Sequence, residues 1–186
     1  KDGATTNNFN EAERAYQGGS AIPEITAGMN VHVDYKGFFM DASGYFAGGH
    51  KVYEDWHRYT NGTDFFSTLY YQGVDAVLDR WQQPGDTGKR FGRFQATTIP
   101  WQSNSKFLYD GDYFRLKNLT VGYDFKSEML DAAGLDGARV FLRGTNLLTW
   151  VKDDRLKYDP EVDAGGQIGL TTPAVKSIIF GINVKF

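Results

Sequence analysis

The hydrophobic residues of this chain recur at every second position in several segments. In 25–35 (ITAGMNVHVDY), the odd positions carry Ile, Ala, Met, Val, Val and Tyr, and the even positions carry polar or small residues. A period of two puts each set of side chains on its own face of an extended strand. The segment therefore predicts a strand with one apolar face and one polar face.

A second strand of the same kind is predicted directly after the first. Lys36-Gly37 forms a short turn, because glycine accepts the positive φ that tight turns need. The next strand begins at Phe38, keeps its apolar residues at even positions and is expected to run to about Tyr53. The two strands predict an antiparallel hairpin.

A strand at about 112–125 carries a change of phase. Phe114 and Leu116 share one parity, whereas Leu119 and Val121 share the other. One inserted residue near Asn118 would return both pairs to the same face, which indicates a β-bulge.

Two further strands are predicted, at about 139–148 with weaker alternation and at 175–186. In the last strand the alternating apolar residues are Ile178, Phe180, Ile182, Val184 and Phe186. Phe186 is expected to end this final strand.

The links between the strands differ in length in a regular way. The 36–37 turn and the 126–138 connection are short, whereas the 57–111 and 149–174 connections are long. The first long connection has room for a short helix or strand within 64–81. Membrane β-barrels have short periplasmic turns and long extracellular loops. With Phe186 at the periplasmic side, both short links fall on that side and both long links fall outside.

Aromatic residues cluster where the short links are expected. Tyr35, Phe38, Tyr123, Phe125 and Phe186 would lie near the periplasmic interface and form the aromatic girdle of such a barrel. The alternative is aromatic core packing in a soluble β-sandwich, whose strands alternate in the same way. A secreted carbohydrate-binding sandwich would need no detergent for extraction, whereas a barrel would.

Composition narrows the function classes. The 186 residues carry a net charge of −3 and no Cys, which leaves no basic excess for nucleic acid, no disulfide and no thiolate metal site. The sequence has no apolar run of the roughly 20 residues that a membrane helix needs. About five strands cannot close a barrel, and Lys1–Asn10 lacks a Met and a signal-peptide pattern, so we expect a piece of a longer protein.

The stretch 105–123 (SKFLYDGDYFRLKNLTVGY) resembles the C-terminal part of the SusC-like (RagA-type) TonB-dependent transporters of Bacteroidetes. The matching landmarks, in order, are Pro23, 25–28 (ITAG), 35–38 (YKGF), Trp81, 110–119 (DGDYFRLKNL), Gly122-Tyr123, 146–149 (NLLT), 159–161 (DPE), Pro173, Gly181, Asn183 and Phe186. Asp112 stands where the family usually has Ser, and 56–106 shows no detailed match.

The resemblance implies an all-β fold, a transmembrane antiparallel β-barrel of about 22 strands around a plug, of which this chain would supply about five C-terminal strands. It implies an outer-membrane location and TonB-driven import of oligosaccharides or oligopeptides. The implied partners are a SusD-like lipoprotein, TonB (through the missing N-terminal part), the barrel-assembly machinery, a glycan or peptide substrate, and membrane lipid. No nucleic-acid partner and no cofactor are expected.

Two groups of side chains are candidates for contacts. Trp81, Trp101, Tyr70 and Tyr71 would stack on substrate or touch the lid protein, the alternative being a packed loop core. Phe186, Val184, Ile182 and Phe180 resemble the signal that the barrel-assembly machinery reads, and an apolar strand with a free end could add to a sheet edge. The alternative for Phe186 is an interface aromatic.

The remaining polar residues do not predict an enzyme. The acidic residues Asp153, Asp154, Asp159, Glu161 and Asp163 lack the spacing of an EF-hand, so we interpret them as a solvated acidic loop with a turn at 159–161. His32, His50 and His57 are not spaced as a helical metal-binding pair, and His32 would face the barrel interior. Neither a G-x-S-x-G elbow nor a phosphate-binding glycine loop occurs.

Overall fold

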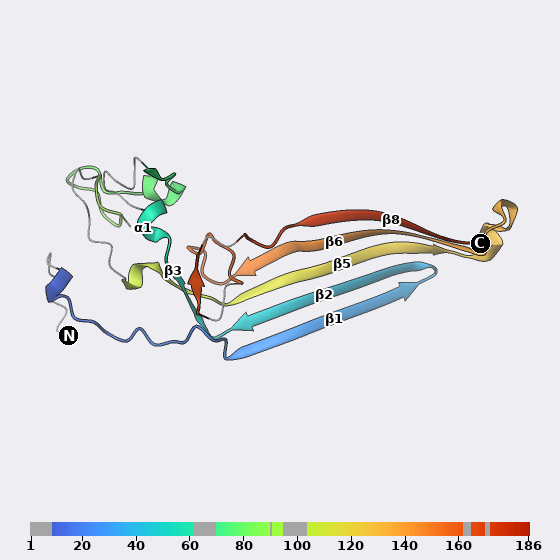
Figure 1. Cartoon of the computed structure of the whole chain (residues 1–186), viewed down its shortest axis with the longest axis horizontal. Coiled ribbons are helices and arrows are strands. Elements are labelled where there is room, and N and C mark those ends of the chain that lie inside the picture. Colours follow the sequence, from blue (N-terminus) through green and yellow to red (C-terminus); the bar gives the residue numbers. More distant parts are fainter. Residues whose placement is uncertain (1–8, 62–69, 90, 95–103, 162–164, 170–171) are drawn as a thin grey trace.

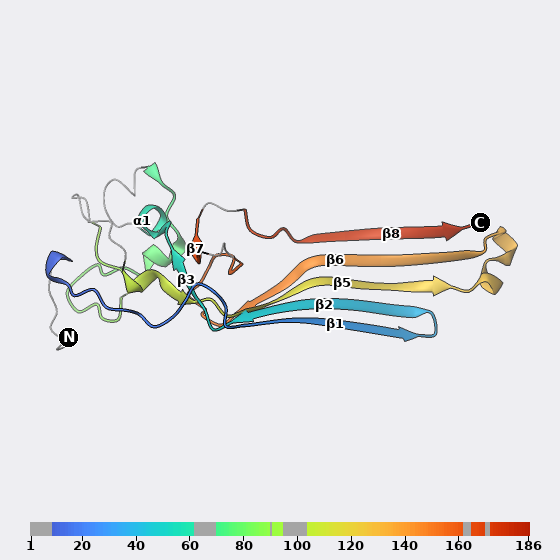
Figure 2. The ribbon, with the colours of Figure 1, turned by 60° about the horizontal axis from the view of Figure 1, so that its bottom comes forward.

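The computed structural model describes residues 9–61, 70–89, 91–94, 104–161, 165–169 and 172–186. Five long strands form one antiparallel sheet in the order β1-β2-β5-β6-β8. Their bounds are β1 Ile25–Tyr35, β2 Phe38–Gly48, β5 Tyr113–Phe125, β6 Gly137–Val151 and β8 Ser177–Lys185. Figures 1 and 2 show them side by side as a single layer that runs most of the length of the molecule.

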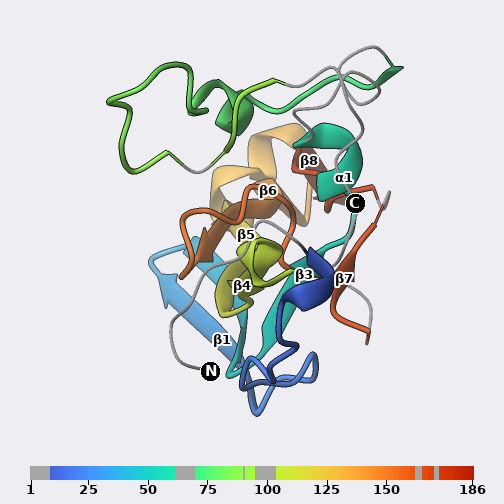
Figure 3. The same ribbon diagram turned by 90° about the vertical axis from the view of Figure 1, so that its left-hand side faces the viewer.

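A second, three-stranded sheet lies beyond one end of the long strands, in the order β4-β3-β7 (Figure 3). It combines β3 (Lys51–Glu54), β4 (Leu108–Asp110) and β7 (Gln167–Ile168). The short helix α1 (His57–Thr60) and the 3-10 turns η2 (Asp75–Leu78) and η3 (Ser105–Phe107) lie at the same end. We call the described residues of 49–61, 70–112 and 152–169 the loop cluster. A further 3-10 turn, η1 (Phe9–Glu11), lies near the N-terminus.

The opposite end of the long sheet carries the two short links. The Lys36-Gly37 turn joins β1 to β2, with φ values of 49° and 91°. The link between β5 and β6 contains the 3-10 turns η4 (Ser127–Met129) and η5 (Asp131–Ala133). The C-terminus lies at this end, and the long connections lie at the other (Figure 1). The predicted alternation of short and long links is therefore confirmed.

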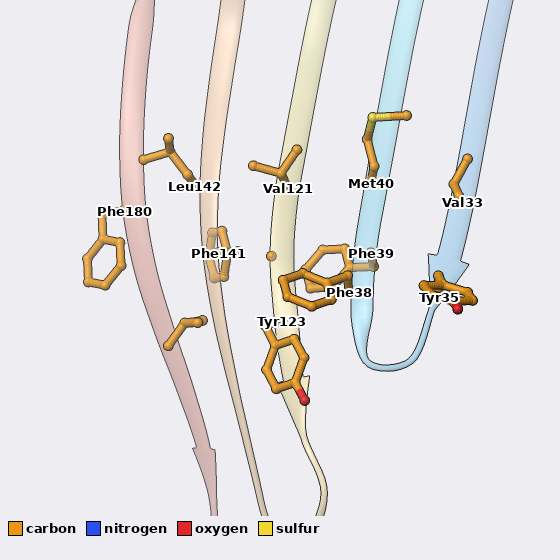
Figure 4. A pocket seen from close by; sticks show the side chains of 12 residues that line it. Val33, Tyr35, Phe38, Phe39, Met40, Val121, Tyr123, Phe141, Leu142 and Phe180 are labelled. Carbon is orange, nitrogen blue, oxygen red and sulfur yellow. The ribbon is translucent and has the colours of Figure 1, made fainter.

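Antiparallel register places an alternating set of apolar side chains from all five strands on one face. Val33 pairs with Met40, Met40 with Val121, Val121 with Leu142, and Leu142 with Phe180. These five residues form a continuous row across the sheet (Figure 4). We call this side the apolar face, and the side that carries residues such as His32 and Asp41 the polar face.

The predicted bulge in β5 is confirmed. The register shifts between Leu116 and Asn118, which leaves Lys117 without a partner in both neighbouring ladders. Leu116 then pairs with Gly44 and Leu119 with Ala42, so both leucines join the apolar face despite their opposite parity.

Several predicted strand limits were wrong, including the start of the last strand, β8, which lies at Ser177 and not at residue 175. β2 ends at Gly48 because Gly49, at φ 78°, turns the chain into the separate strand β3. β6 extends to Val151 because the backbone irregularity at Asn146 (φ 52°) interrupts the ladder without ending it. β8 ends at Lys185, whose partner is Gly137, so Phe186 lies just past the last cross-strand pair.

The β-sandwich alternative finds no support in the described residues. Its apolar face would be covered by a second sheet. Here Met29 is 51% exposed and Phe180 67% exposed, in the middle of strands that lack such a cover within the described ranges. Among the same residues, no helix has the length and apolar character to span a membrane.

Candidate functional site

The apolar face is bordered by aromatic residues at both ends. At the short-link end, Tyr35 pairs with Phe38 and Phe38 with Tyr123, and the Phe38 and Tyr123 ring centroids are 4.7 Å apart. At the other end Phe46, Phe114 and Trp150 form a second row of cross-strand partners. The first row was predicted; the second was not.

The band between the two aromatic rows approaches the height of the apolar band of an outer-membrane barrel. Phe38 and Phe46 both lie in β2, eight positions apart, which is about 27 Å along an antiparallel strand. Tilted as barrel strands are, that length spans roughly 20 Å along the membrane normal, close to the apolar band of outer-membrane barrels. Within the described residues, the strand positions of the apolar face that lie between these rows hold no Asp, Glu, Lys, Arg or His.

The polar face carries paired charges. Arg139 donates from Nε and Nη2 to the two carboxylate oxygens of Asp124, at 2.5 and 2.6 Å, and its guanidinium lies 4.4 Å from the Phe39 ring centroid. His32 bonds to Asp34 and Asp41 through its two ring nitrogens. The prediction that His32 lies on the polar side of the strand agrees with this register.

Two glycines on the polar face receive aromatic rings from the neighbouring strand. A Cβ on Gly122 would lie 2.5 Å from the Phe39 ring, and a Cβ on Gly181 would lie 2.2 Å from the Phe141 ring. Each ring occupies the space that a side chain at the glycine position would fill, which is how aromatic residues support strand glycines.

The loop cluster has a small core of its own. Val52, Tyr109, Leu156 and Ile168 are each at most 4% exposed, and they come from β3, β4, the 153–156 segment and β7. Because these segments are far apart in sequence, the core fixes the long connections to one another.

Glu54 lies beside this core with its carboxylate buried. Its side chain is held by the Tyr109 hydroxyl, which donates to Oε2 at 2.6 Å, and by Nδ2 of Asn61, which donates to Oε1. His57 bonds to the backbone oxygen of Glu54 and stacks on Phe107 at 3.9 Å. Neighbouring polar groups therefore fix Glu54 in one conformation.

Arg115 anchors the 153–161 segment to the polar face. Its side chain is 1% exposed and forms ion pairs with Asp159 and, at 3.2 Å, with Glu161. Asp159 also accepts the backbone N–H groups of Glu161 and Ala174, at 2.9 and 3.0 Å. Burial raises the pKa of Asp159, but these two N–H groups and the Arg115 guanidinium outweigh it and hold the pKa below its ordinary value.

The expectation of a solvated acidic loop was therefore wrong for Asp153 and Asp159, whose side chains are 9% and 18% exposed, whereas Asp154 and Glu161 are exposed. Asp159 and Glu161 pair with Arg115, Glu161 also pairs with Lys117, and Asp153 pairs with Arg155. Asp163 lies outside the described residues. In the part of the chain that the structure describes, no group of three His, Cys, Asp or Glu side chains is arranged to hold a metal ion.

A cavity of about 650 Å³ opens in the loop cluster beside Glu54. The other residues that line it are Asn61, Gly73, Val74, Asp75, Tyr109, Arg155, Lys157 and Tyr158. Its volume is in the range of small-molecule sites, and it combines aromatic walls with a few polar groups.

The predicted contact residues fall in different places. The ring centroids of Tyr71 and Tyr59 are 4.6 Å apart, as are those of Tyr59 and Trp56, so three mutually tilted aromatic rings form a row in the loop cluster. Tyr70 is 67% exposed. Trp81 donates its backbone N–H to Phe91 in a separate segment, and Trp101 lies outside the described residues. The predicted role of all four in contacts stays a prediction.

The residues of the cavity were missed by sequence reasoning. Glu54, Arg155 and Lys157 occupy no recognisable motif, and Glu54 meets the other two only because Leu156 packs against Val52 and Tyr109 in the core. The Arg115–Asp159 pair could have been suspected, since both residues belong to the family landmarks at 110–119 and 159–161.

No family model matches the chain. Among curated proteins it is similar to three receptors of Formosa agariphila, TonB-dependent receptors P26, P3 and P39, with 31%, 37% and 23% identity. Each alignment covers 90% of this chain but 17% of the relative, so the chain spans about a sixth of their length.

Solved structures show the same arrangement. The RagAB peptide importer in its closed-closed state matches with a TM-score of 0.70 and 25% identity, over 90% of this chain and 18% of that chain. The RagAB peptide transporter matches with a TM-score of 0.73 over the same shares, at 24% identity, which supports the fold alone.

Proposed function

Because this chain is a segment of a SusC-like (RagA-type) TonB-dependent receptor of the outer membrane, we propose that it forms the last five strands of a plugged barrel. The apolar face would contact lipid, and the polar face would line the lumen. The short links would lie in the periplasm and the loop cluster outside the cell. The observation that carries this proposal is the uncharged band between two aromatic rows.

The full receptor, on this proposal, imports oligosaccharides or oligopeptides with energy from TonB. A plug and a TonB-contacting segment outside this chain would supply the gate and the coupling, and a SusD-like lipoprotein would cover the outer end. Support comes from the similarity to proteins named TonB-dependent receptors and to the RagAB peptide importer. These similar proteins carry the names of receptors and an importer rather than of enzymes.

A pair of neighbouring substitutions tests the orientation of the sheet. Met29 and Asn30 lie in the middle of β1 on opposite faces. Met29→Arg would put a charge into lipid at a cost of about 2–4 kcal/mol, whereas Asn30→Arg would place the same charge in the lumen. In the full receptor, Met29→Arg should reduce the heat-modifiable folded form in outer-membrane fractions. Equal yields of the two variants would contradict the proposed orientation.

The aromatic row of Trp56, Tyr59 and Tyr71 is proposed to contact substrate or the lipoprotein. Together with Tyr70 and Trp81 it lies in the part of the chain assigned to the cell exterior. Tyr71→Ala removes the outermost ring of the row, while Tyr71→Phe keeps it. Weaker co-purification of the lipoprotein, or slower uptake, with Tyr71→Ala but not with Tyr71→Phe is expected. Unchanged behaviour of both would remove Tyr71 from the proposal.

The end of the chain is proposed to act in barrel assembly. Phe180, Ile182 and Val184 point to the apolar face, and Phe186 is 86% exposed just past β8. Phe186→Ala should slow insertion of the receptor, measured as the folded fraction against time after synthesis. Phe125→Ala, at the same end of the sheet, is the control for loss of an interface aromatic. Equal delays in the two variants would leave Phe186 only an interface role.

A further inference from the structure

Glu54 is a buried carboxylate that, among the residues described, lacks a cationic partner. Its exposed fraction is 2%. Among the described residues, no Lys, Arg or His side chain lies within ion-pairing distance of its carboxylate. Its oxygens receive hydrogen bonds from the neutral side chains of Tyr109 and Asn61 instead. A buried charge without an opposite charge is unfavourable, because neutral donors replace only part of the hydration that burial removes.

The same carboxylate forms part of the wall of the 650 Å³ cavity. Asp75 adds a second carboxylate to the cavity wall. The cationic side chains in the wall are those of Arg155 and Lys157. Arg155 is already paired with Asp153 at 2.6 Å, and Lys157 donates to the backbone oxygen of Asp154. The negative charge of Glu54 is therefore not neutralised from within the cavity.

The rest of the wall suits an organic ligand better than a bare ion. Tyr109, Tyr158 and Val74 supply apolar and aromatic surface. The described residues also lack a cluster of three ligating side chains that would hold a metal ion. The cationic group of a larger molecule would bind the carboxylate, and the rest of that molecule would pack against the aromatic wall.

We propose that this cavity binds a ligand through a primary ammonium group, with Glu54 as its counter-charge. Two kinds of ligand carry such a group in the substrate classes considered above: the amino terminus or a lysine of a peptide, and the amine of an amino sugar. The role of the ligand as imported substrate rests on the proposed function, whereas binding to the cavity does not.

The test uses the full-length receptor purified in detergent and four matched probes. Trialanine and glucosamine carry the ammonium group, and N-acetyltrialanine and N-acetylglucosamine lack it. By calorimetry, the acetylated probe of at least one pair should bind about tenfold or more weaker than its amine, which corresponds to about 1.4 kcal/mol. The pair that shows the difference identifies the kind of ligand. Equal binding within both pairs, or no binding of either amine, would overturn the proposal.

Variants locate the binding at Glu54. Glu54→Gln should lose the preference for the amine, while Glu128→Gln, which removes a distant charge at the short-link end, should keep it. Since the Glu54→Gln substitution could disturb the bonds to Asn61 and Tyr109, the thermal unfolding of that variant is measured beside its binding. Asp75→Asn neutralises an exposed carboxylate of the same cavity, and it should also weaken the preference for the amine. A preference that survives both cavity variants would overturn the assignment to this site. A receptor that assembles in the outer membrane yet ignores amines would reject this inference alone, whereas a failure to assemble there would reject the proposed function.

Discussion

The long sheet and the loop cluster place the same residue type in opposite environments. Ile168 in β7 is 3% exposed and belongs to a core, whereas Ile182 in β8 is 57% exposed on the apolar face. The loop cluster buries apolar side chains away from water, as any soluble domain does. The sheet instead presents them outward, which is stable only where the surroundings are also apolar. The two regions are thus built for two solvents.

The two regions also differ in where they place their charged side chains. The loop cluster buries Glu54. A buried ion pair between Asp159 of the loop cluster and Arg115 of β5 connects the cluster to the sheet. The sheet keeps its charges on the polar face, in pairs such as Arg139 with Asp124. Buried and exposed ion pairs differ in their energetic weight, because water and salt screen only the second kind. This difference can be measured with single substitutions.

The largest effect is expected at Asp159. Asp159→Asn leaves the buried Arg115 without its main counter-charge, and breaking a buried pair in this way costs about 3–5 kcal/mol. The 153–161 segment should detach, which hydrogen exchange of its backbone amides would show as lost protection. The matched control Glu161→Gln changes a half-exposed member of the same group, at 42% exposure, and should cost under about 1 kcal/mol. Similar losses in both variants would mean that the pairs are equivalent.

A pair of isoleucines addresses the difference in solvent directly. Ile168→Ala removes buried methyl groups and should destabilise the loop cluster by about 2–4 kcal/mol. Ile182→Ala removes the same groups from the apolar face, where detergent or lipid fills the space, and should cost under about 1 kcal/mol. Proteolysis of the loop cluster and heat-modifiable migration of the barrel report on the two regions separately. A large loss from Ile182→Ala would show that protein rather than lipid covers that face.

A somewhat smaller effect is expected at the polar face of the sheet. Gly181→Ala places a methyl group within 2.2 Å of the present Phe141 ring, so the ring must move. Overpacking of this kind typically costs about 1–3 kcal/mol. The midpoint of unfolding of the refolded receptor in denaturant is the measurement. Phe141→Leu combined with Gly181→Ala should recover part of the loss, and no recovery would mean that the ring is not the obstacle.

The sheet was largely predictable because its information is local. The alternation in 25–35 gave β1 with its observed bounds, and the opposite parities of Leu116 and Leu119 located the bulge. Both follow from a strand having an apolar side and a polar side, so every position reports its face. Strand ends were less predictable, since Gly49 and Asn146 change the backbone direction without a change in hydrophobicity.

The loop cluster was not predictable from the same signals. Its core joins Val52, Tyr109, Leu156 and Ile168, which belong to segments without periodicity. Asp159 and Arg115 are 44 positions apart, and a sequence does not state which acid meets which base. The expectation of a solvated acidic loop failed for that reason. The cavity beside Glu54 likewise exists only once four segments of the chain have come together.

The smallest expected effect is a response to acid that separates the two regions. The Arg155 guanidinium lowers the pKa of Asp153 to about 2. The backbone N–H groups of Arg155 and Asp110 lower this pKa further, and together these groups outweigh partial burial, which raises it. A carboxyl whose pKa is lower in the folded than in the unfolded state stabilises the fold above its unfolded pKa of about 4. That contribution is lost as the pH falls from about 4 to about 2, and Asp159 acts in the same direction. Because Arg155 is half exposed, the share of Asp153 should stay under about 1 kcal/mol.

The carboxylates of the sheet, such as Asp124, lie in half-exposed pairs on the polar face, where water screens them, so strand pairing should persist while the loop cluster loosens. Hydrogen exchange at pH 5, 4, 3 and 2 should therefore increase in 152–161 before it increases in β6 or β8. Asp153→Asn should flatten this response, because the group that takes up the proton is gone. If both regions opened together at every pH, the loop cluster and the sheet would form one cooperative unit, and the contrast between them would concern solvent exposure rather than separate stability.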